Sequence, residues 1–504
     1  MRPCAKSLSR AFRRWIPVTA LGLAGPGLAL AVTAAVIELR EEPLLFADDT
    51  AIVSQTGLVR TIHPALTSPA PVIVSDRPWE GDRVYTYGSL QHDAASGRFG
   101  LWYMSRTQRP GGTQASATLR GGGMDIVGWA TSSDGLRWEK PALGLHAYDG
   151  STANNIVADF HSPAVVVDRF ERDPARRFKL LGYHKGGYYA SYSADGLRWH
   201  PYPQAPVFTG SDTMSMTQDP RTGEFLVYFK KPSPTVPGRI VWHTRSRDFQ
   251  RWSEPRLVFH ADAEDSSWSR HPDQRTEVYN MTVLPHAGGF LGLPTMFRVI
   301  SRAPKEVKLP PSQSGHDGPI DVHLVTSVDG ENWRRTWPRM PVIPRGAPGS
   351  FDGGTILGLT SNCVHAGDET WMLYTAINTG HGGPIPPKRI AIGRATWRRH
   401  GWASLDANPA GGRLETVPLR VAGGTLRINA DASRGQLRAA LRETDGRPIA
   451  GFGFDDFTPL RADATRAVAR WKGGPVPEDR PVRVVVEMDS VRLYSLSADG
   501  PGGR

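Results

Sequence analysis

Cysteine is nearly absent from this chain of 504 residues, which contains only Cys4 and Cys363. Two thiols cannot build a disulfide framework or a cysteine-rich zinc module, because each needs several cysteines at short spacing. The 15 histidines never occur in a His-Glu-x-x-His spacing, and long stretches of helical periodicity are missing as well. We therefore expect a fold held together by packing, and we predict no metal ligands.

Acidic residues are missing from the first 34 positions, where five basic residues lie. A basic stretch ending at Arg14 runs into an apolar stretch from Trp15 to Leu39, which is typical of an export signal. We expect cleavage near Ala35 and export to the periplasm or the extracellular space. The apolar stretch is also long enough to stay as a membrane anchor. Residues 1–39 are thus interpreted as a signal peptide or anchor, and only this segment is expected to meet a membrane.

The positive net charge carries little information about partners. The whole chain has a net charge of +11, and without the five N-terminal basic residues +6 remains. No run of Lys and Arg with interleaved aromatic residues occurs elsewhere, so nucleic-acid binding is not expected.

A short phrase of the form Ser-x-Asp-x-x-x-Trp occurs four times, and a worn fifth copy ends at Trp397. Each copy is typical of a hairpin in which the Asp side chain bonds turn amides and the Trp packs beneath the loop. We therefore predict a structural role for the four acids, which are Asp134, Asp195, Asp248 and Asp329.

The spacing of the phrases predicts the architecture. The tryptophans recur at a supersecondary interval, and a second hairpin signal precedes each phrase, so each unit is expected to contain four antiparallel strands. We predict an all-β protein with a five-bladed β-propeller over residues 40–402, including an N-terminal lead-in. Alternating strands without the repeat predict a C-terminal β-sandwich over residues 403–504.

The export signal, the Ser-x-Asp-Gly-x-x-Trp hairpins, the expected ring and the expected sandwich together resemble bacterial secreted proteins of the glycoside hydrolase family 32 and family 43 type. Trp79-Glu-Gly-Asp82-Arg83 stands where family 32 enzymes carry their first-strand signature. The resemblance implies an exported glycoside hydrolase that acts on a poly- or oligosaccharide. Some family 43 relatives hold a calcium ion at the ring centre, so the resemblance also allows a central calcium, although no cofactor is required.

Carboxylates near the start of the innermost strands are the candidate catalytic groups. Glycoside hydrolysis needs a protonated acid for the leaving oxygen and an ionised carboxylate that attacks or activates water. We interpret Glu277 as the acid and Asp82 as the base or nucleophile, with Asp212 as a third catalytic candidate. Crowding of these acids is expected to raise one pKa by repulsion and keep the donor protonated.

Further residues near the predicted inner or closing strands are candidates for binding the sugar. They offer the aromatic faces, charges and imidazoles that suit sugar hydroxyls, and they are Trp79, Glu80, Arg83, His161, Tyr279, Asp352 and His381. Two alternatives stay open. One is a non-catalytic carbohydrate-binding or scaffold propeller, because a fold does not imply a function. The other is a sialidase-like enzyme, which needs an arginine cluster such as Arg83, Arg270 and Arg298.

Overall fold

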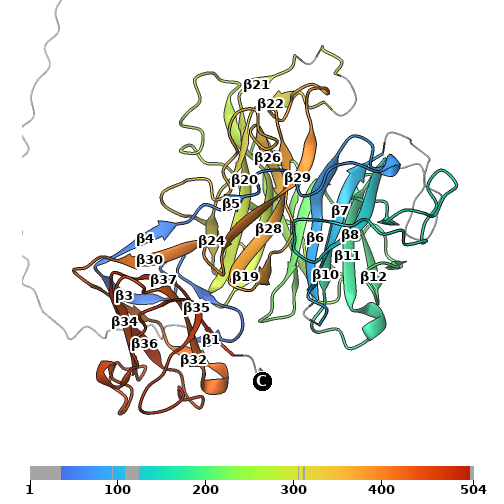
Figure 1. Cartoon of the computed structure of the whole chain (residues 1–504). Helices are drawn as coiled ribbons and strands as arrows, with labels where there is room; N and C mark the ends of the chain where they lie inside the picture. The colour runs from blue at the N-terminus through green and yellow to red at the C-terminus, as the bar shows by residue number, and fades with distance from the viewer. Residues whose placement is uncertain (1–35, 94, 108–123, 305, 310–312, 500–504) are drawn as a thin grey trace, which may run out of the picture. The chain divides into compact units, whose positions relative to one another are not determined.

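The computed structural model describes residues 36–93, 95–107, 124–304, 306–309 and 313–499 (Figure 1). Most of the expected export segment lies outside these residues. No helix among the described residues has the length and apolar character needed to cross a membrane. The helices in this part of the chain are four 3-10 turns of three residues, η1 (Pro78–Glu80), η2 (Pro174–Arg176), η3 (Ala422–Gly424) and η4 (Phe454–Asp456). The predicted all-β class is confirmed.

The repeat region forms three separate sheets and one ten-stranded sheet. The first sheet contains β6 (Val84–Asp93), β7 (Arg98–Arg106), β8 (Asp125–Ser132) and β9 (Ile156–Ala158). The second contains β10 (His161–Val167), β11 (Phe178–His184), β12 (Gly187–Ser193), β13 (His200–Pro201) and β14 (Phe208–Thr209). The third contains β15 (Ser211–Gln218), β16 (Phe225–Lys230), β17 (Val241–Ser246) and β18 (Arg256–Phe259).

The ten-stranded sheet joins two further sets of strands. One set is β19 (Arg275–His286), β20 (Gly289–Val299), β24 (Val325–Ser327) and β25 (Arg334–Arg335). The other is β26 (Thr355–Leu359), β27 (Val364–Ala366), β28 (Glu369–Ile377), β29 (Ile390–Arg398) and β5 (Leu66–Thr67). The strand β23 (Ile320–Val322) connects them by pairing with both β20 and β26, and β21 (Ser301–Arg302) pairs separately with β22 (His316–Asp317).

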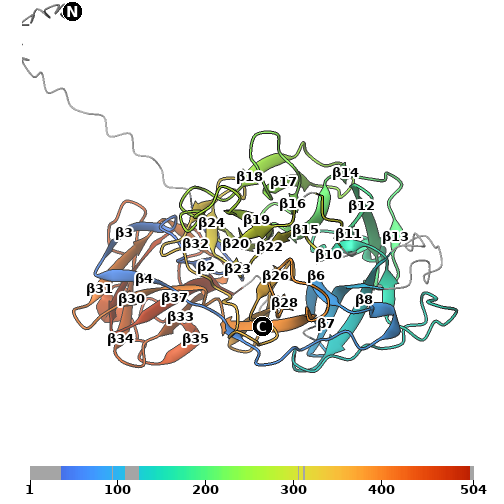
Figure 2. The same ribbon diagram turned by 90° about the horizontal axis from the view of Figure 1, so that it is seen from above.

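The first strands of these sets contact one another in a circle. β6 contacts β10, β10 contacts β15, β15 contacts β19, β19 contacts β26, and β26 contacts β6 again. Figure 2 shows these strands gathered around one centre, with the later strands of each set farther out. Because successive strands are antiparallel, the start of a first strand, the end of a second and the start of a third share one edge. We call it the carboxylate edge, and the opposite edge, where the third strands end, the turn edge.

Each Ser-x-Asp phrase forms a tight turn at the turn edge. In the first copy, the Asp134 carboxylate accepts hydrogen bonds from the amides of Leu136 and Arg137, both at 2.8 Å, and Ser132 Oγ accepts one from the Gly135 amide. The same bonds recur in the copies centred on Asp195, Asp248 and Asp329. The predicted structural role of these four acids is confirmed.

Aromatic side chains tie the turns of one sheet to the strands of the next. Trp102 of β7 donates its indole N–H to the carbonyl of Gly196 in the next sheet's turn, at 2.7 Å. Tyr228 of β16 donates to Gly330 in the same manner, at 2.9 Å. The turn glycine of the first sheet, Gly135, packs directly against Trp371 of β28. The first and last sets of strands are therefore neighbours.

The C-terminal region consists of two sheets around one apolar core. One sheet contains β35 (Asp463–Val468), β33 (Leu426–Asp431), β37 (Arg492–Ala498), β30 (Ala403–Ala407), β4 (Leu58–Ile62) and β2 (Leu44–Leu45). The other contains β3 (Ile52–Thr56), β31 (Gly412–Thr416), β36 (Arg483–Asp489) and β34 (Gln436–Arg442). Buried side chains of both sheets, such as Leu405, Ile428, Leu441 and Val486, belong to the same cluster.

The N-terminal lead-in departs from the prediction that grouped it with the repeats. β1 (Ile37–Leu39) pairs with β32 (Leu419–Val421), and β2, β3 and β4 pair with β37, β31 and β30. Residues up to Ile62 thus belong to the C-terminal sheets, because their apolar side chains, among them Leu44 and Phe46, complete that core. The later part of the lead-in joins the repeats, where β5 pairs with β29 and Ile73 forms an isolated bridge with Ile392.

Candidate functional site

Charged side chains from several strands meet at the carboxylate edge. Asp82 precedes β6, Asp212 and Glu277 lie near the starts of β15 and β19, and His161 begins β10. Second strands end at this edge, and they add Arg106 of β7 and Lys230 of β16. The position of these residues in the sequence explains why they gather. A residue at a strand start lies just before the backbone begins its hydrogen bonds to the next strand. Its side chain can therefore face the centre of the circle of strands.

Asp82 is held by its neighbour in the chain. The Arg83 guanidinium binds both carboxylate oxygens of Asp82, at 2.5 and 2.8 Å. The Asp82 side chain keeps 28% of its surface exposed, whereas that of Arg83 keeps 7%. Burial alone would lower the pKa of Arg83, but the bond with Asp82 raises it overall. Asp82 is thus a carboxylate that a guanidinium holds and that solvent can reach.

Asp212 is the most accessible of the three candidate acids. Lys230 Nζ lies 2.7 Å from its carboxylate, and 41% of the Asp212 side chain is exposed. Burial would raise the pKa of Asp212, but Lys230 and His161 hold it below the usual value. Its charge also raises the pKa of Tyr87, Tyr188 and Tyr279, which places it among three tyrosines.

Glu277 is enclosed by arginines. Arg239 binds one carboxylate oxygen at 2.6 Å, Arg275 binds the other, and 1% of the Glu277 side chain is exposed. Burial would raise the pKa of Glu277, but Arg239, Arg275 and His316 lower it overall. The backbone of Gly238 also lies against this side chain. Arg239 and Arg275 are themselves partly exposed, with 20% and 24% of their side chains accessible, so both reach solvent from the buried carboxylate.

The expected repulsion between crowded acids does not operate here. Each of the three carboxylates has its own cation, and the pKa values of Asp212 and Glu277 are lowered rather than raised. An opposite charge within a few ångströms outweighs both burial and more distant acids. In this structure Glu277 is ionised and lacks the proton that a general acid must donate.

Lys230 links two of the carboxylates. Burial lowers the pKa of Lys230, while Asp212 and Glu277 both raise it, so the ammonium lies within electrostatic range of both acids. Its Nζ also lies 4.1 Å from the centre of the Tyr279 ring. Asp212, Lys230, Tyr279 and Glu277 therefore form one continuous group.

Three of the predicted sugar-binding residues, His161, Tyr279 and His381, lie at this edge. His161 Nδ1 is 3.3 Å from Asp125, and the ring packs against Tyr87. The His381 ring contacts Tyr279, with centroids 5.1 Å apart. Burial, together with Arg239, Lys388 and Lys230, lowers the pKa of His381 to about 3, so this imidazole is neutral.

Two predicted substrate contacts do not reach solvent. Glu80 has no exposed surface, because Tyr103 and Lys140 bind its carboxylate at 2.5 and 2.7 Å and the amides of Asp76 and Arg77 also donate to it. Asp352 is 3% exposed and accepts hydrogen bonds from Tyr374 and Ser350, both at 2.8 Å. Both acids satisfy buried donors, so neither side chain is exposed to a sugar in this structure, and their binding roles stay predictions.

Trp79 and the proposed arginine cluster are also placed by structural contacts. Trp79 donates its indole N–H to Asn155 at 2.8 Å and packs on a small apolar cluster. Arg270 is exposed and hydrogen-bonds to the carbonyls of Ser267 and Ser269 in its own loop. Arg83 is bound to Asp82, so these contacts do not favour a sialidase-like arginine cluster.

Several residues of this edge escaped the sequence analysis. Arg106, Asp125, Lys230, Arg239, His316 and Lys388 belong to no repeated phrase. A usable signal existed for Lys230 and Arg106, since each ends a second strand, and second strands end at the edge where first strands begin. Among the described residues, no group of three or more His, Cys, Asp or Glu side chains is placed to hold a metal ion.

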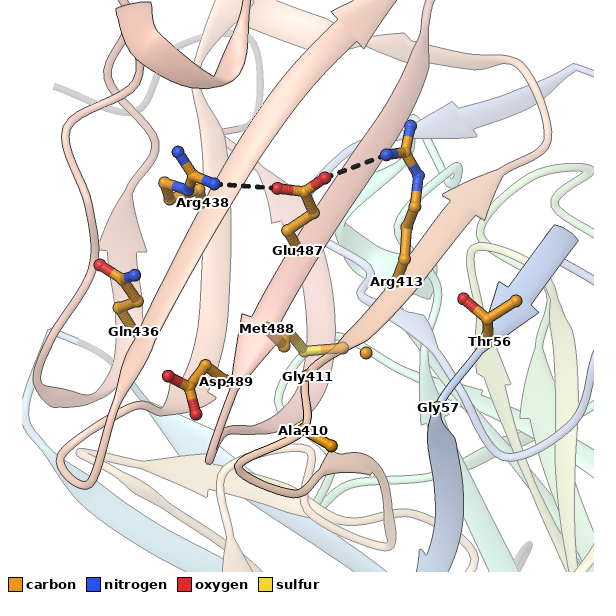
Figure 3. A pocket seen from close by; sticks show the side chains of 11 residues that line it. Thr56, Gly57, Ala410, Gly411, Arg413, Gln436, Arg438, Glu487, Met488 and Asp489 are labelled. Carbon is orange, nitrogen blue, oxygen red and sulfur yellow. Dashed lines mark hydrogen bonds and ion pairs between the residues drawn. The ribbon is translucent and has the colours of Figure 1, made fainter.

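A hollow of about 520 Å³ lies on the four-stranded C-terminal sheet, and none of Asp82, Asp212 and Glu277 lines it (Figure 3). Its central feature is Glu487 of β36, which binds Arg413 of β31 at 3.0 Å and Arg438 of β34 at 3.1 Å. Both arginines are the register partners of Glu487. These contacts are a cross-strand ladder of ion pairs, which stabilises a sheet without any ligand.

No family model matches the chain, and no curated protein matches its sequence. Among solved structures, it is similar to an N-acetylgalactosamine deacetylase from F. plautii in complex with blood group B trisaccharide, with 15% identity over 68% of this chain and 96% of the other and a TM-score of 0.40. It is similar to a thermostable family-43 glycoside hydrolase, with 13% identity over 68% and 91% of the chains and a TM-score of 0.39. A β-1,2-mannobiose phosphorylase from Listeria innocua, in complex with β-1,2-mannobiose, shows 10% identity over 68% and 97% of the chains and a TM-score of 0.40. No activity and no residue role is taken from these similarities.

Proposed function

We propose that the chain is an exported glycoside hydrolase that acts on a poly- or oligosaccharide at the carboxylate edge. The observation that carries this proposal is the position of Asp82, Asp212 and Glu277 at the starts of three first strands that share one edge. Two carboxyl groups flanking a glycosidic bond suffice for its hydrolysis. The N-terminal basic and apolar stretch supports export, and no cofactor is needed for this chemistry.

The fold part of the proposal is a five-bladed propeller followed by a β-sandwich. The circle of contacts from β6 through β10, β15, β19 and β26 back to β6 supports five blades. The packing of Gly135 on Trp371 supports closure between the first and the last blade. The shared apolar core of the two C-terminal sheets supports the sandwich.

The proposed roles follow from exposure and charge. Asp82, bound to Arg83 and 28% exposed, acts as the base or nucleophile. Asp212 orients the substrate, and its charge raises the pKa of Lys230, which lies 2.7 Å away. Glu277 acts as the proton donor only after a bound substrate draws Arg239 away, because burial then raises the pKa of Glu277 with less opposition.

A non-catalytic carbohydrate-binding protein is the second candidate function. The specific observation in its favour is that every candidate acid is paired with a cation, and Glu277 is closed off from solvent. Such pairing keeps charged side chains in place for binding but supplies no proton for bond cleavage.

The test is hydrolysis of a glycan panel by the wild-type protein and by Asp82→Asn and Glu277→Gln. Each substitution keeps the shape and removes the ionisable group, so turnover on a responsive glycan should fall roughly 100-fold to 10,000-fold. Asp134→Asn removes a charge at the turn edge and should leave turnover unchanged. Near-normal rates for both edge variants contradict the assigned roles, and binding without cleavage across the panel supports the second candidate.

A further inference from the structure

Lys388 is a buried lysine at the carboxylate edge. It lies in the loop between β28 and β29, and 8% of its surface is exposed. Its Nζ donates to the carbonyl of His381 at 2.5 Å. Within the part of the chain that the structure describes, no carboxylate forms an ion pair with it. An ammonium group offers three hydrogens, so this side chain retains donor capacity.

The surroundings of Lys388 are rich in positive charge. Lys388, Lys230 and Arg239 all lower the pKa of His381, so three cations lie around one neutral imidazole. Lys230 and Arg239 also lie over the Tyr279 ring, at 4.1 and 5.4 Å from its centre. Lys230 has Asp212 as a counter-ion and Arg239 has Glu277, which leaves Lys388 as the cation without one among the described residues of this group.

The position of Lys388 is fixed by its loop. The amide of His381 donates to Gly318, the amide of Gly382 donates to Asp317 at 2.8 Å, and the amide of Arg389 donates to Asn378 at 2.7 Å. The Lys388 amide itself donates to Pro384 at 3.0 Å. The ammonium is therefore held in place rather than free to extend into water.

A buried ammonium without a counter-ion is unfavourable in free energy. Burial and the nearby Arg83 lower the pKa of Lys388 to about 8, although Asp317 opposes this. Moving a charge out of water without a counter-ion is unfavourable, and an anion supplied by a ligand removes that cost.

We propose that the carboxylate edge binds a sugar that carries an anionic group, and that Lys388 contacts this group. A hexuronic acid carboxylate and a sulfate ester share the required chemistry. The anion also gives Arg239 a competing partner, which would loosen its bond with Glu277. This inference rests on the proposed function only in taking the ligand to be a sugar.

The experiment is isothermal titration calorimetry of the full exported chain with three probes. They are a trisaccharide of galacturonic acid, its carboxyl-reduced neutral counterpart, and a sulfated galactan oligosaccharide. The wild-type protein should bind one anionic probe at least about tenfold more tightly than the neutral probe, since a hydrogen bond to a charged group contributes that much. The anionic probe with the higher affinity identifies the source of the anion.

Lys388→Met should weaken binding of that anionic probe by about tenfold or more, and Lys388→Arg should retain most of it. Lys472→Met, which removes an exposed lysine of the C-terminal region, is the matched control and should bind as the wild type does. If Lys388→Met does not fold, wild-type binding of the anionic probe is measured at rising ionic strength. A charged contact weakens as ionic strength rises, so an affinity that does not change with salt contradicts the inference.

Equal affinity for the charged and neutral probes, or failure to bind either anionic probe, overturns the inference. Hydrolysis of a neutral glycan together with that result leaves the proposed hydrolase function intact. Binding of an anionic probe through Lys388 without cleavage of any glycan supports this inference and contradicts the proposed hydrolase function.

Discussion

The two edges of the repeat sheets use acidic residues in opposite ways. At the turn edge, Asp134, Asp195, Asp248 and Asp329 accept hydrogen bonds from amides within three residues along the chain. At the carboxylate edge, Asp212 and Glu277 are held by side chains from other strands or loops, Lys230 and Arg239. A carboxylate satisfied by its own turn is a folding element, whereas one balanced by a distant cation can exchange that cation for a ligand.

The difference also appears in the sequence. The turn-edge acids recur in a phrase because each set of strands needs the same turn. The carboxylate-edge acids recur in position, near the starts of first strands, but no shared phrase surrounds them. A repeated phrase therefore marks structure in this chain, whereas the candidate site is marked by the position of its acids alone.

Replacing one arginine at each edge should give the largest difference between the two kinds of acid in the pH dependence of activity. Arg239→Gln leaves burial of Glu277 less opposed, so the pKa of Glu277 rises and the limb of the kcat/KM profile that this group governs moves to higher pH. At a fixed pH on that limb, the rate should change by about tenfold or more. The measurement is kcat/KM against pH on a responsive glycan.

Arg198→Gln is the matched control at the turn edge, where Arg198 binds Asp195 at 2.8 Å. Its pH profile should coincide with that of the wild type. Identical profiles for all three proteins mean that Glu277 takes no part in proton transfer.

One glycine at each edge allows the packing of the two edges to be compared. Gly196 at the turn edge has a φ of +75°, and an added Cβ would lie 2.6 Å from the Trp102 ring, which cannot move because it is buried and bonded to Gly196. Gly186 at the carboxylate edge has a φ of +87° with no atom within 4 Å of such a Cβ. Gly186→Ala should cost about 1 to 2 kcal/mol for the left-handed backbone, and Gly196→Ala roughly 1 to 3 kcal/mol more.

Chemical denaturation of both alanine variants measures this difference. Equal losses of stability would show that the tie between neighbouring sheets tolerates the added methyl group.

The smallest expected effect concerns a single turn acid. Burial would raise the pKa of Asp329, but the amides of Asn332 and Glu331 and the Asn332 side chain hold it at about 2. The bonds of this ionised acid stabilise the fold above the ordinary Asp pKa and are lost as pH falls towards 2. Asp329→Ala should cost about 1 kcal/mol at neutral pH and less in acid, with unchanged activity.

Thermal melts of Asp329→Ala and wild type between pH 2 and pH 7 provide the check. A constant difference in stability across this range is the outcome that contradicts the titration of Asp329.

Local chemistry made part of this structure predictable. The Ser-x-Asp phrases, with Gly135 or Gly196 at the turn, specify their hairpins within seven residues, so the strands around them follow from the sequence. The positions of Asp82, Asp212 and His161 followed in turn from the rule that first strands start at one edge, and the roles of these residues stay predictions.

Most departures from the expectations involve partners that are distant in the sequence. Glu80 and Asp352 have the right residue type near a strand start, but Lys140 and Tyr374 bind them in the interior. The pairing of Leu44 with Leu496 has no local signal, because two alternating strands suit many partners equally well. The ion pairs of Glu277 with Arg239 and Arg275 reversed its expected pKa shift, since loop residues supply half of them.

The pairing of the first strands with the last has a consequence for synthesis on the ribosome. β2 cannot pair until β37 has been made, and β5 cannot pair until β29 has been made, so the described strands between residues 37 and 67 lack their sheet partners until most of the chain exists. Such long-range contacts give a high contact order and slow folding. The exposed strands β2 to β4 are open to wrong pairing during that time, and a chaperone that holds the unfinished chain would raise the yield of native protein.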